Sequence, residues 1–142
     1  REAEAGFQAG ATGVTHIFNA MRPFHHREPG IAGFALANPH VYVEVIADPY
    51  HLHLETIRLV FGAKPQNRVL IVSDSVKGAC YGRGKGVVNG EPGESLPVSE
   101  AARLAGGSMS LAASAGRLVA AGFDEAAIRQ AVSDNPACFL GG

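Results

Sequence analysis

The stretch Val69-Leu70-Ile71-Val72-Ser73-Asp74-Ser75 is an apolar run that gives way at once to polar residues. The apolar part is short and β-branched, which predicts a strand over Val69–Val72. Because the strand is apolar on both of its faces, it fits a parallel sheet that helices cover on both sides. The stretch therefore predicts an α/β fold in which Asp74 follows the carboxyl end of a buried strand.

Two other apolar runs lead into polar clusters in the same way. The segment Val14–Phe18 predicts a strand that carries His16 and runs into Asn19-Ala20-Met21. The segment Val41–Ala47 predicts a strand that runs into Asp48-Pro49-Tyr50-His51. Crossovers between parallel strands are right-handed, so the carboxyl ends of such strands share one edge. We expect the three polar clusters to meet at that edge, where a (β/α) barrel enzyme builds its site.

In the rest of the chain apolar residues recur at helical spacing and are followed by residues that end helices. They predict helices over 1–10, 34–38, 53–61, 109–121 and 124–132, the last of them ended by Asn135-Pro136. A hairpin or extended loop is expected over 75–98, and a helical stretch begins at Ser99. Gly106-Gly107-Ser108 is expected to start a helix whose backbone N–H groups face an anion or acyl group.

Length and composition narrow the class of protein. A closed eight-stranded α/β barrel needs about 200 to 250 residues, so a chain of 142 residues predicts a small α/β domain or part of a larger one. The net charge of −1, with mixed signs, argues against nucleic acid or a membrane surface as partner. No apolar run approaches the ~18 residues of a membrane span. Cys80 and Cys138 lack metal-ligand spacing, which is typical of free thiols in the cytoplasm.

Most chemical candidates in the strand-end clusters also have an ordinary structural interpretation. His16 can bind a divalent metal, although a histidine beside a strand is often only a hydrogen-bonded structural residue. His51 can bond an oxyanion or a sugar hydroxyl. Asp74, near a metal, can take a proton from water and return it to a leaving amine, or it can cap a loop. Asp48-Pro49 is also an ordinary turn initiator.

Arg27 stands in a long loop, in the segment His26-Arg27-Glu28-Pro29-Gly30. Its planar guanidinium suits a phosphate because the donors form a fixed fork. The alternative is a surface ion pair. Asn19 is likewise either a ligand contact or a turn residue.

The order of these motifs resembles one enzyme family. The segments Thr15–Met21, Arg27–Gly30, Ile46–His51, Val72–Ser75 and Leu104–Ser108 resemble N-acetylglucosamine-6-phosphate deacetylase, of the amidohydrolase superfamily. The resemblance implies a partial (β/α)8 TIM-type barrel over residues 1–142, roughly its sixth to eighth strands with their helices. It departs from the family at Pro49, where a Gly is usual, and at Ser73 and Ser75, which replace Thr and Ala.

The resemblance also implies a role for each matching residue. His16 is implied to bind the metal, and Asp74 to transfer the proton. Substrate contacts are implied for Asn19, Ala20, Arg27, Asp48, Pro49, Tyr50, His51, Leu104, Ala105 and Gly106. The implied cofactor is a divalent metal, zinc first, with iron, manganese or cobalt as alternatives. The family's other metal-binding Glu and His correspond to positions before residue 1.

We therefore predict a cytoplasmic, homodimeric enzyme that hydrolyses N-acetylglucosamine 6-phosphate to glucosamine 6-phosphate and acetate. One alternative is an amidohydrolase that acts on a different amide, although a neutral substrate would not need Arg27. A second alternative is that these 142 residues are an inactive folding module, because one His cannot replace about three protein ligands. Open sheet edges further predict self-association of the 142-residue chain, or its association with a partner fragment, rather than a monomer.

Overall fold

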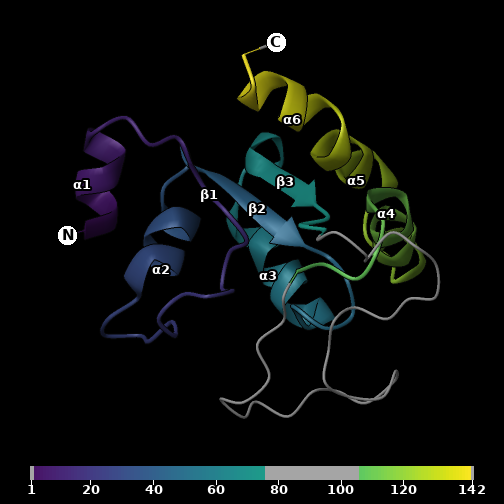
Figure 1. Ribbon diagram of the computed structural model, residues 1–142, viewed down its shortest axis with the longest axis horizontal. Helices are drawn as coiled ribbons and strands as arrows, with labels where there is room; N and C mark the ends of the chain where they lie inside the picture. Colours follow the sequence, from purple (N-terminus) through teal and green to yellow (C-terminus); the bar gives the residue numbers. More distant parts are fainter. Residues whose placement is uncertain (1, 76–105, 142) are drawn as a thin grey trace.

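A three-stranded parallel sheet lies at the centre of the protein (Figure 1). The computed structural model describes residues 2–75 and 106–141. The strands are β1 (Gly13–Val14), β2 (Tyr42–Ile46) and β3 (Val69–Val72), in the order β1-β2-β3. Both pairings are parallel, and Ile46 pairs with Val72 at the carboxyl ends. The prediction of an α/β fold with a parallel sheet is confirmed.

Helices lie beside both outer strands of the sheet. They are α1 (Glu2–Gln8), α2 (Gly30–Ala37), α3 (Leu54–Ala63), the 3-10 turn η1 (Gln66–Arg68), α4 (Leu111–Ala120), α5 (Glu125–Val132) and α6 (Asp134–Phe139). Figure 1 shows α1 and α2 beside β1, and α4 to α6 beside β3. Side chains at three helix starts, His53, Ser110 and Asp124, accept hydrogen bonds from backbone N–H groups of the first turn.

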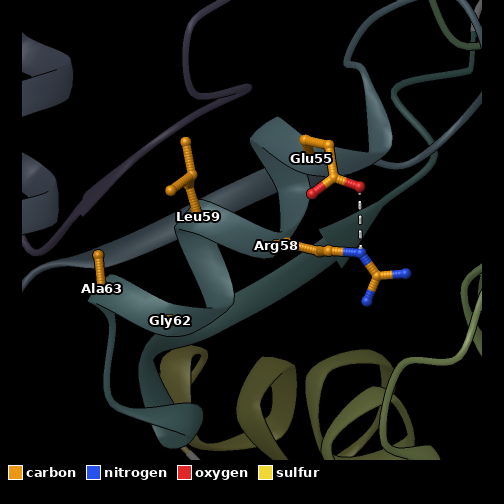
Figure 2. A pocket seen from close by; sticks show the side chains of 5 residues that line it. All are labelled: Glu55, Arg58, Leu59, Gly62 and Ala63. Atoms are coloured by element: carbon orange, nitrogen blue, oxygen red, sulfur yellow. Dashed lines mark ion pairs between the residues drawn. The ribbon is translucent and has the colours of Figure 1, made fainter.

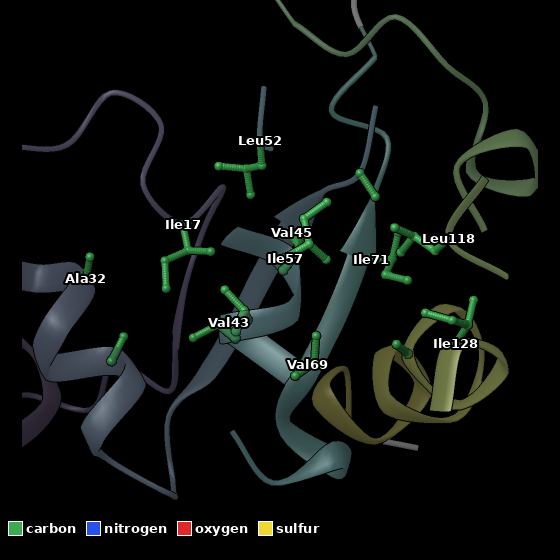
Figure 3. Packing of buried hydrophobic residues seen from close by; sticks show 14 of the residues in the cluster. Ile17, Ala32, Val43, Val45, Leu52, Ile57, Val69, Ile71, Leu118 and Ile128 are labelled. Carbon is green, nitrogen blue, oxygen red and sulfur yellow. The ribbon is translucent and has the colours of Figure 1, made fainter. Parts of the chain in front are cut away.

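The core forms where one face of the sheet meets these helices. Pairing of Val43 with Val69 and of Val45 with Ile71 puts these four side chains on the same face. Each is 2% exposed or less, and they belong to one cluster with Ile57 of α3, Leu118 of α4 and Ile128 of α5 (Figure 3). This packing fixes the strand ends relative to one another.

The first strand is much shorter than the sequence predicts. It ends at Val14, and the expected strand residues His16 and Phe18 have φ angles of 35° and 72°, in the left-handed region. Ile17 is nevertheless fully buried, and its N–H donates to the carbonyl of Glu44 on β2 at 2.8 Å. The apolar pattern of Val14–Phe18 therefore reflects a buried turn and not a strand.

Two expectations about the carboxyl-terminal third are wrong. Asn135-Pro136 does not end the helical region, because both residues lie in the first turn of α6, where proline's missing N–H costs nothing. Gly106-Gly107-Ser108 does not start a helix. Instead Gly107 forms a parallel bridge with Ser75, and α4 begins at Leu111. The expected hairpin, from 76 onward, and the helical stretch from Ser99 lie outside the described residues.

Candidate functional site

Strained backbone marks two of the three polar clusters. The non-glycine residues with positive φ in the described ranges are His16 (35°), Phe18 (72°), Ala20 (52°) and Asp74 (47°). Side-chain-bearing residues avoid this region because Cβ crowds the backbone, so each position carries a conformational cost. Such strain concentrates at active and binding sites, where the surrounding structure enforces it. Three of these four residues are candidates from the sequence.

The first cluster follows β1 and is tied to β2. The Thr15 hydroxyl donates to the Glu44 carboxylate. The Asn19 amide donates to the carbonyl of Ile17 at 3.2 Å, as a turn residue does. His16 is half-buried, and its Nδ1 is buried without a hydrogen bond to any residue that the structure describes. A shielded and unbonded imidazole nitrogen is costly unless a ligand satisfies it.

The second cluster is organised by the buried carboxylate of Asp48, directly after β2. Asp48 is 1% exposed, and its Oδ1 accepts from the backbone N–H groups of Tyr50 and His51, both at 2.9 Å. The Nδ1 of His51 lies 2.9 Å from both carboxylate oxygens. In this arrangement the side chain of Asp48 positions its neighbours. Pro49 lies exposed at the turn.

The hydrogen bonds of Asp48 also set its charge. Burial by itself would raise the pKa of Asp48, but the hydrogen bonds from His51, Ser108 and Tyr50 lower it well below its ordinary value. The carboxylate is therefore ionised throughout the neutral range. Hydrogen bonds from these three residues favour the charged form and outweigh the desolvation that opposes it.

A short segment, Gly107-Ser108, joins the second cluster to the third. The N–H and Oγ of Ser108 donate to Oδ2 of Asp48 at 2.9 and 3.0 Å. The N–H of Gly107 donates to the carbonyl of Asp74 at 2.8 Å. Asp74 itself is exposed, two residues after the end of β3. The structure thus brings the residues after β2 and β3 together through a segment more than 30 residues further along the chain.

The arginine of the long loop is in the open. Arg27 is exposed, and its backbone N–H donates to Nδ1 of His25 at 3.2 Å. The expected alternative, a surface ion pair, is formed in this loop by Arg22 with Glu2 at 2.9 Å rather than by Arg27. Among the described residues the Arg27 guanidinium has no acidic partner, so it is free for an anion.

A complete metal site is not present in residues 2–75 and 106–141. In these ranges no three His, Cys, Asp or Glu side chains are grouped closely enough to hold an ion. His16 fits as one ligand, because its Nδ1 is buried and unbonded. The remaining ligands of a metal would have to come from outside the described residues.

One surface pocket among the described residues is unrelated to these clusters. Figure 2 shows it on the outer side of α3, lined by Glu55, Arg58, Leu59, Gly62 and Ala63. Glu55 and Arg58 form an ion pair of 3.5 Å at its rim. A single helix supplies the whole lining, so this pocket is a groove along α3 and not a catalytic cleft.

Some candidates were missed or cannot be placed. Leu104 and Ala105 lie outside the described residues, while Gly106 is buried beside the bridging segment. Sequence reasoning did not assign Ser108 to Asp48, nor Arg117, whose guanidinium donates to the carbonyl of Ala47 at 3.0 Å. The separation of 60 residues between Ser108 and Asp48 left no local signal of their contact.

Parallel strands followed at their carboxyl ends by polar turns, two of them strained, define a class of fold: an α/β fold of the kind in which enzymes build their sites at one edge of a sheet. Every helix of the described ranges is too short or too polar to cross a membrane. The particular similarity is to N-acetylglucosamine-6-phosphate deacetylases, in sequence and in structure.

The sequence similarity is strong but covers part of the relatives. The enzyme of Bacillus subtilis is 46% identical over 70 residues, or 49% of this chain and 18% of the relative. The enzyme of Lysinibacillus sphaericus is 34% identical over 106 residues, or 72% of this chain and 26% of the relative. The chain thus spans about a quarter or less of these relatives. No family model matches the chain.

Solved structures give the same result over nearly the full chain. The deacetylase of Thermotoga maritima aligns with a TM-score of 0.81 and 29% identity, covering 99% of this chain and 40% of that structure. A variant of the Mycobacterium smegmatis enzyme, in complex with N-acetyl-D-glucosamine-6-phosphate, aligns with a TM-score of 0.74 and 30% identity. The resemblance predicted from the motifs is confirmed.

Proposed function

We propose that the protein carrying this chain hydrolyses the N-acetyl group of N-acetylglucosamine 6-phosphate. The observation that carries the proposal is the backbone strain at His16, Ala20 and Asp74, which singles out the turns after two parallel strands. These are residues for which the sequence resemblance implies metal, substrate and proton-transfer roles. The similarity to deacetylases along 99% of the chain supports the same function.

We further propose that the three strands belong to a (β/α)8 barrel. The similar structure from Thermotoga maritima is more than twice as long as this chain, which covers 40% of it. In a barrel the outer edges of β1 and β3 would pair with other strands. The polar clusters after the strands would then form one part of a site that other strands complete.

The chemistry follows from the groups available after the strands. A divalent metal with His16 among its ligands would polarise the amide carbonyl and favour attack by water. Asp74 accepts a proton from the water as the new oxygen–carbon bond forms. It returns that proton to the nitrogen as the carbon–nitrogen bond breaks. The products are acetic acid and the amine, and the proton that the acid releases protonates the amine, so they leave as acetate and ammonium with atoms and protons in balance.

The remaining candidates bind rather than react. Arg27 would hold the 6-phosphate, because its exposed guanidinium is free of a described acidic partner. Asn19 and Ala20 lie in the strained turn after β1, and His51 lies in the turn after β2. These turns follow adjacent strands, which supports contacts of their residues with one small substrate.

A comparison of substrates tests the proposal. The protein that carries this chain is assayed with N-acetylglucosamine, with and without the 6-phosphate. We expect turnover of the phosphorylated sugar, a kcat lower by about 10²- to 10⁴-fold in Asp74→Asn, and a KM raised about tenfold or more in Arg27→Ala. Arg22→Ala, a loop arginine already paired with Glu2, is the matched control. Turnover of only the unphosphorylated sugar would refute the proposal.

A further inference from the structure

A chain of hydrogen bonds links Ser108, Asp48 and His51. Ser108 donates twice to Oδ2 of Asp48, from its N–H at 2.9 Å and from its Oγ at 3.0 Å. Both oxygens of Asp48 lie 2.9 Å from Nδ1 of His51. The side chains of His51 and Asp48 are 5% and 1% exposed, and Ser108 is 7% exposed. These three residues are shielded from water, which stabilises the hydrogen bonds between them.

This geometry determines where the imidazole of His51 carries its hydrogen. An ionised carboxylate has no hydrogen to give, so Nδ1 of His51 must be the donor in this contact. In the neutral ring Nε2 is then an acceptor. Within the described ranges Nε2 of His51 makes no hydrogen bond, so it is the nitrogen left for a ligand.

Ser108 matters because it completes the hydrogen bonding of the carboxylate. Oδ1 of Asp48 is already held by the N–H groups of Tyr50 and His51. The described donors to Oδ2, apart from His51, both come from Ser108. Without the Ser108 hydroxyl this oxygen loses one partner in a buried environment, and the position of the carboxylate against Nδ1 is less tightly held.

We propose that Ser108 is a positioning residue that acts through Asp48 to hold His51 as the Nδ1–H tautomer. The proposal rests on the proposed function, since it specifies what His51 does for the substrate. Held in this way, Nε2 accepts a hydrogen bond, which suits a sugar hydroxyl. An oxyanion needs a donor instead, and His51 would serve it only with a second proton on the ring.

The same segment also supports the proton-transfer residue. Gly107, next to Ser108, donates its N–H to the carbonyl of Asp74 at 2.8 Å. A displacement of Ser108 therefore changes the support of Asp74 as well as that of His51. This shared support makes Ser108 a link between substrate binding and proton transfer.

Nitrogen NMR of the histidine rings tests the tautomer in the protein that carries this chain. For wild type we expect Nδ1 of His51 to be protonated and Nε2 unprotonated. Asp48→Ala removes both acceptor oxygens that face Nδ1 and should shift the population toward the Nε2–H form. Ser108→Ala should reduce the Nδ1–H population, and Ser108→Thr, which keeps a hydroxyl, should restore it. Ser133→Ala, at an exposed serine whose side chain makes no cap bond, is the control.

Three results would overturn the proposal. The first is a wild-type ring in the Nε2–H form or with both nitrogens protonated. The second is a tautomer that Asp48→Ala leaves unchanged, and the third is a folded Ser108→Ala variant with the wild-type Nδ1–H population. If Ser108→Ala fails to fold, Ser108→Cys takes its place, because it keeps a side chain of similar shape but offers only a weak S–H donor. In the deacetylation assay Ser108→Ala should raise KM several-fold more than it lowers kcat. Absence of all deacetylation, with the Nδ1–H tautomer present, would refute the proposed function and leave the positioning intact.

Discussion

Gly107 is the described glycine with the least room for a side chain. A Cβ at this position would lie 1.7 Å from the carbonyl oxygen of Ser73, which is backbone and cannot rotate away. The close approach lets the segment bridge to Ser75 and donate to Asp74. Only glycine fits at position 107, because any Cβ would overlap the carbonyl oxygen of Ser73.

The first prediction concerns this glycine. Gly107→Ala should lower the free energy of unfolding by about 1–3 kcal/mol, because the backbone must move to relieve the overlap. Urea unfolding of the protein measures the loss. Gly116→Ala is the matched control: Gly116 lies in α4 with nothing near its missing Cβ, so alanine should raise stability by up to about 1 kcal/mol. Equal effects of the two substitutions would contradict the bridge.

The second prediction concerns acid stability and Asp48. Its pKa is lowered in the folded state, so below its ordinary value of 3.8 the unfolded chain binds protons more readily than the folded one. Stability from Asp48 is complete above that value and is lost as the pH falls through and below it. Asp48→Asn should therefore cost stability near pH 6, and the difference from wild type should shrink by about pH 3. Asp134→Asn, at an exposed position, should show no such convergence.

At the residue scale the sequence predicted the candidate site residues better than it predicted the contacts between them. His16, His51 and Asp74 were singled out because polar residues directly after apolar runs are visible as a local pattern. The partnership of Ser108 with Asp48 was not predictable, since it depends on a 60-residue return of the chain. The substrate and metal roles of these residues stay predictions.

At the scale of elements, the sequence predicted strands and helices best where burial and backbone shape agree. The predicted strand Val69–Val72 is confirmed with the same bounds. The prediction of Val14–Phe18 was wrong, because Ile17 is buried in a left-handed turn that resembles a strand in sequence. α6 was missed because its proline lies in the first turn, where a proline is tolerated.

The third prediction concerns what holds α6 against the sheet. Asn135 is 2% exposed, and its Nδ2 donates to the carbonyls of Gln66 and Val69, both at 2.7 Å. Asn135→Ala removes both hydrogen bonds, leaves the buried carbonyl of Val69 without this donor and should lower the free energy of unfolding by about 2 kcal/mol. Ser133→Ala, one residue before α6 and exposed, should change it little. Thermal unfolding of both variants compares them, and an unaffected Asn135→Ala would show that α6 is held by apolar packing alone.

At the scale of the whole molecule, the described sheet has open edges. β1 and β3 each pair with β2 on one side only. Large apolar side chains are also exposed, Leu59 at 70% and Leu140 at 83%. Unpaired N–H and C=O groups together with apolar surface favour association with another chain.

The fourth prediction follows for the 142-residue polypeptide, which we expect to self-associate. Sedimentation equilibrium over a range of concentrations should give an apparent mass above 14.7 kDa that rises with concentration. In a longer protein whose own strands pair with these edges, the edges should not make the apparent mass rise with concentration. A stable monomer of the 142 residues at high concentration would refute the prediction.

The last prediction concerns metal and turnover by the same 142-residue polypeptide. A catalytic zinc needs about three protein ligands, and the described residues offer His16 without two companions nearby. We therefore expect weak zinc binding, reduced further in His16→Ala, and no release of acetate from N-acetylglucosamine 6-phosphate. Calorimetric titration with zinc and an acetate assay measure the two quantities. Tight binding of one zinc per chain with turnover would mean that these residues form a complete site, and would place the missing ligands within the 142 residues rather than beyond them.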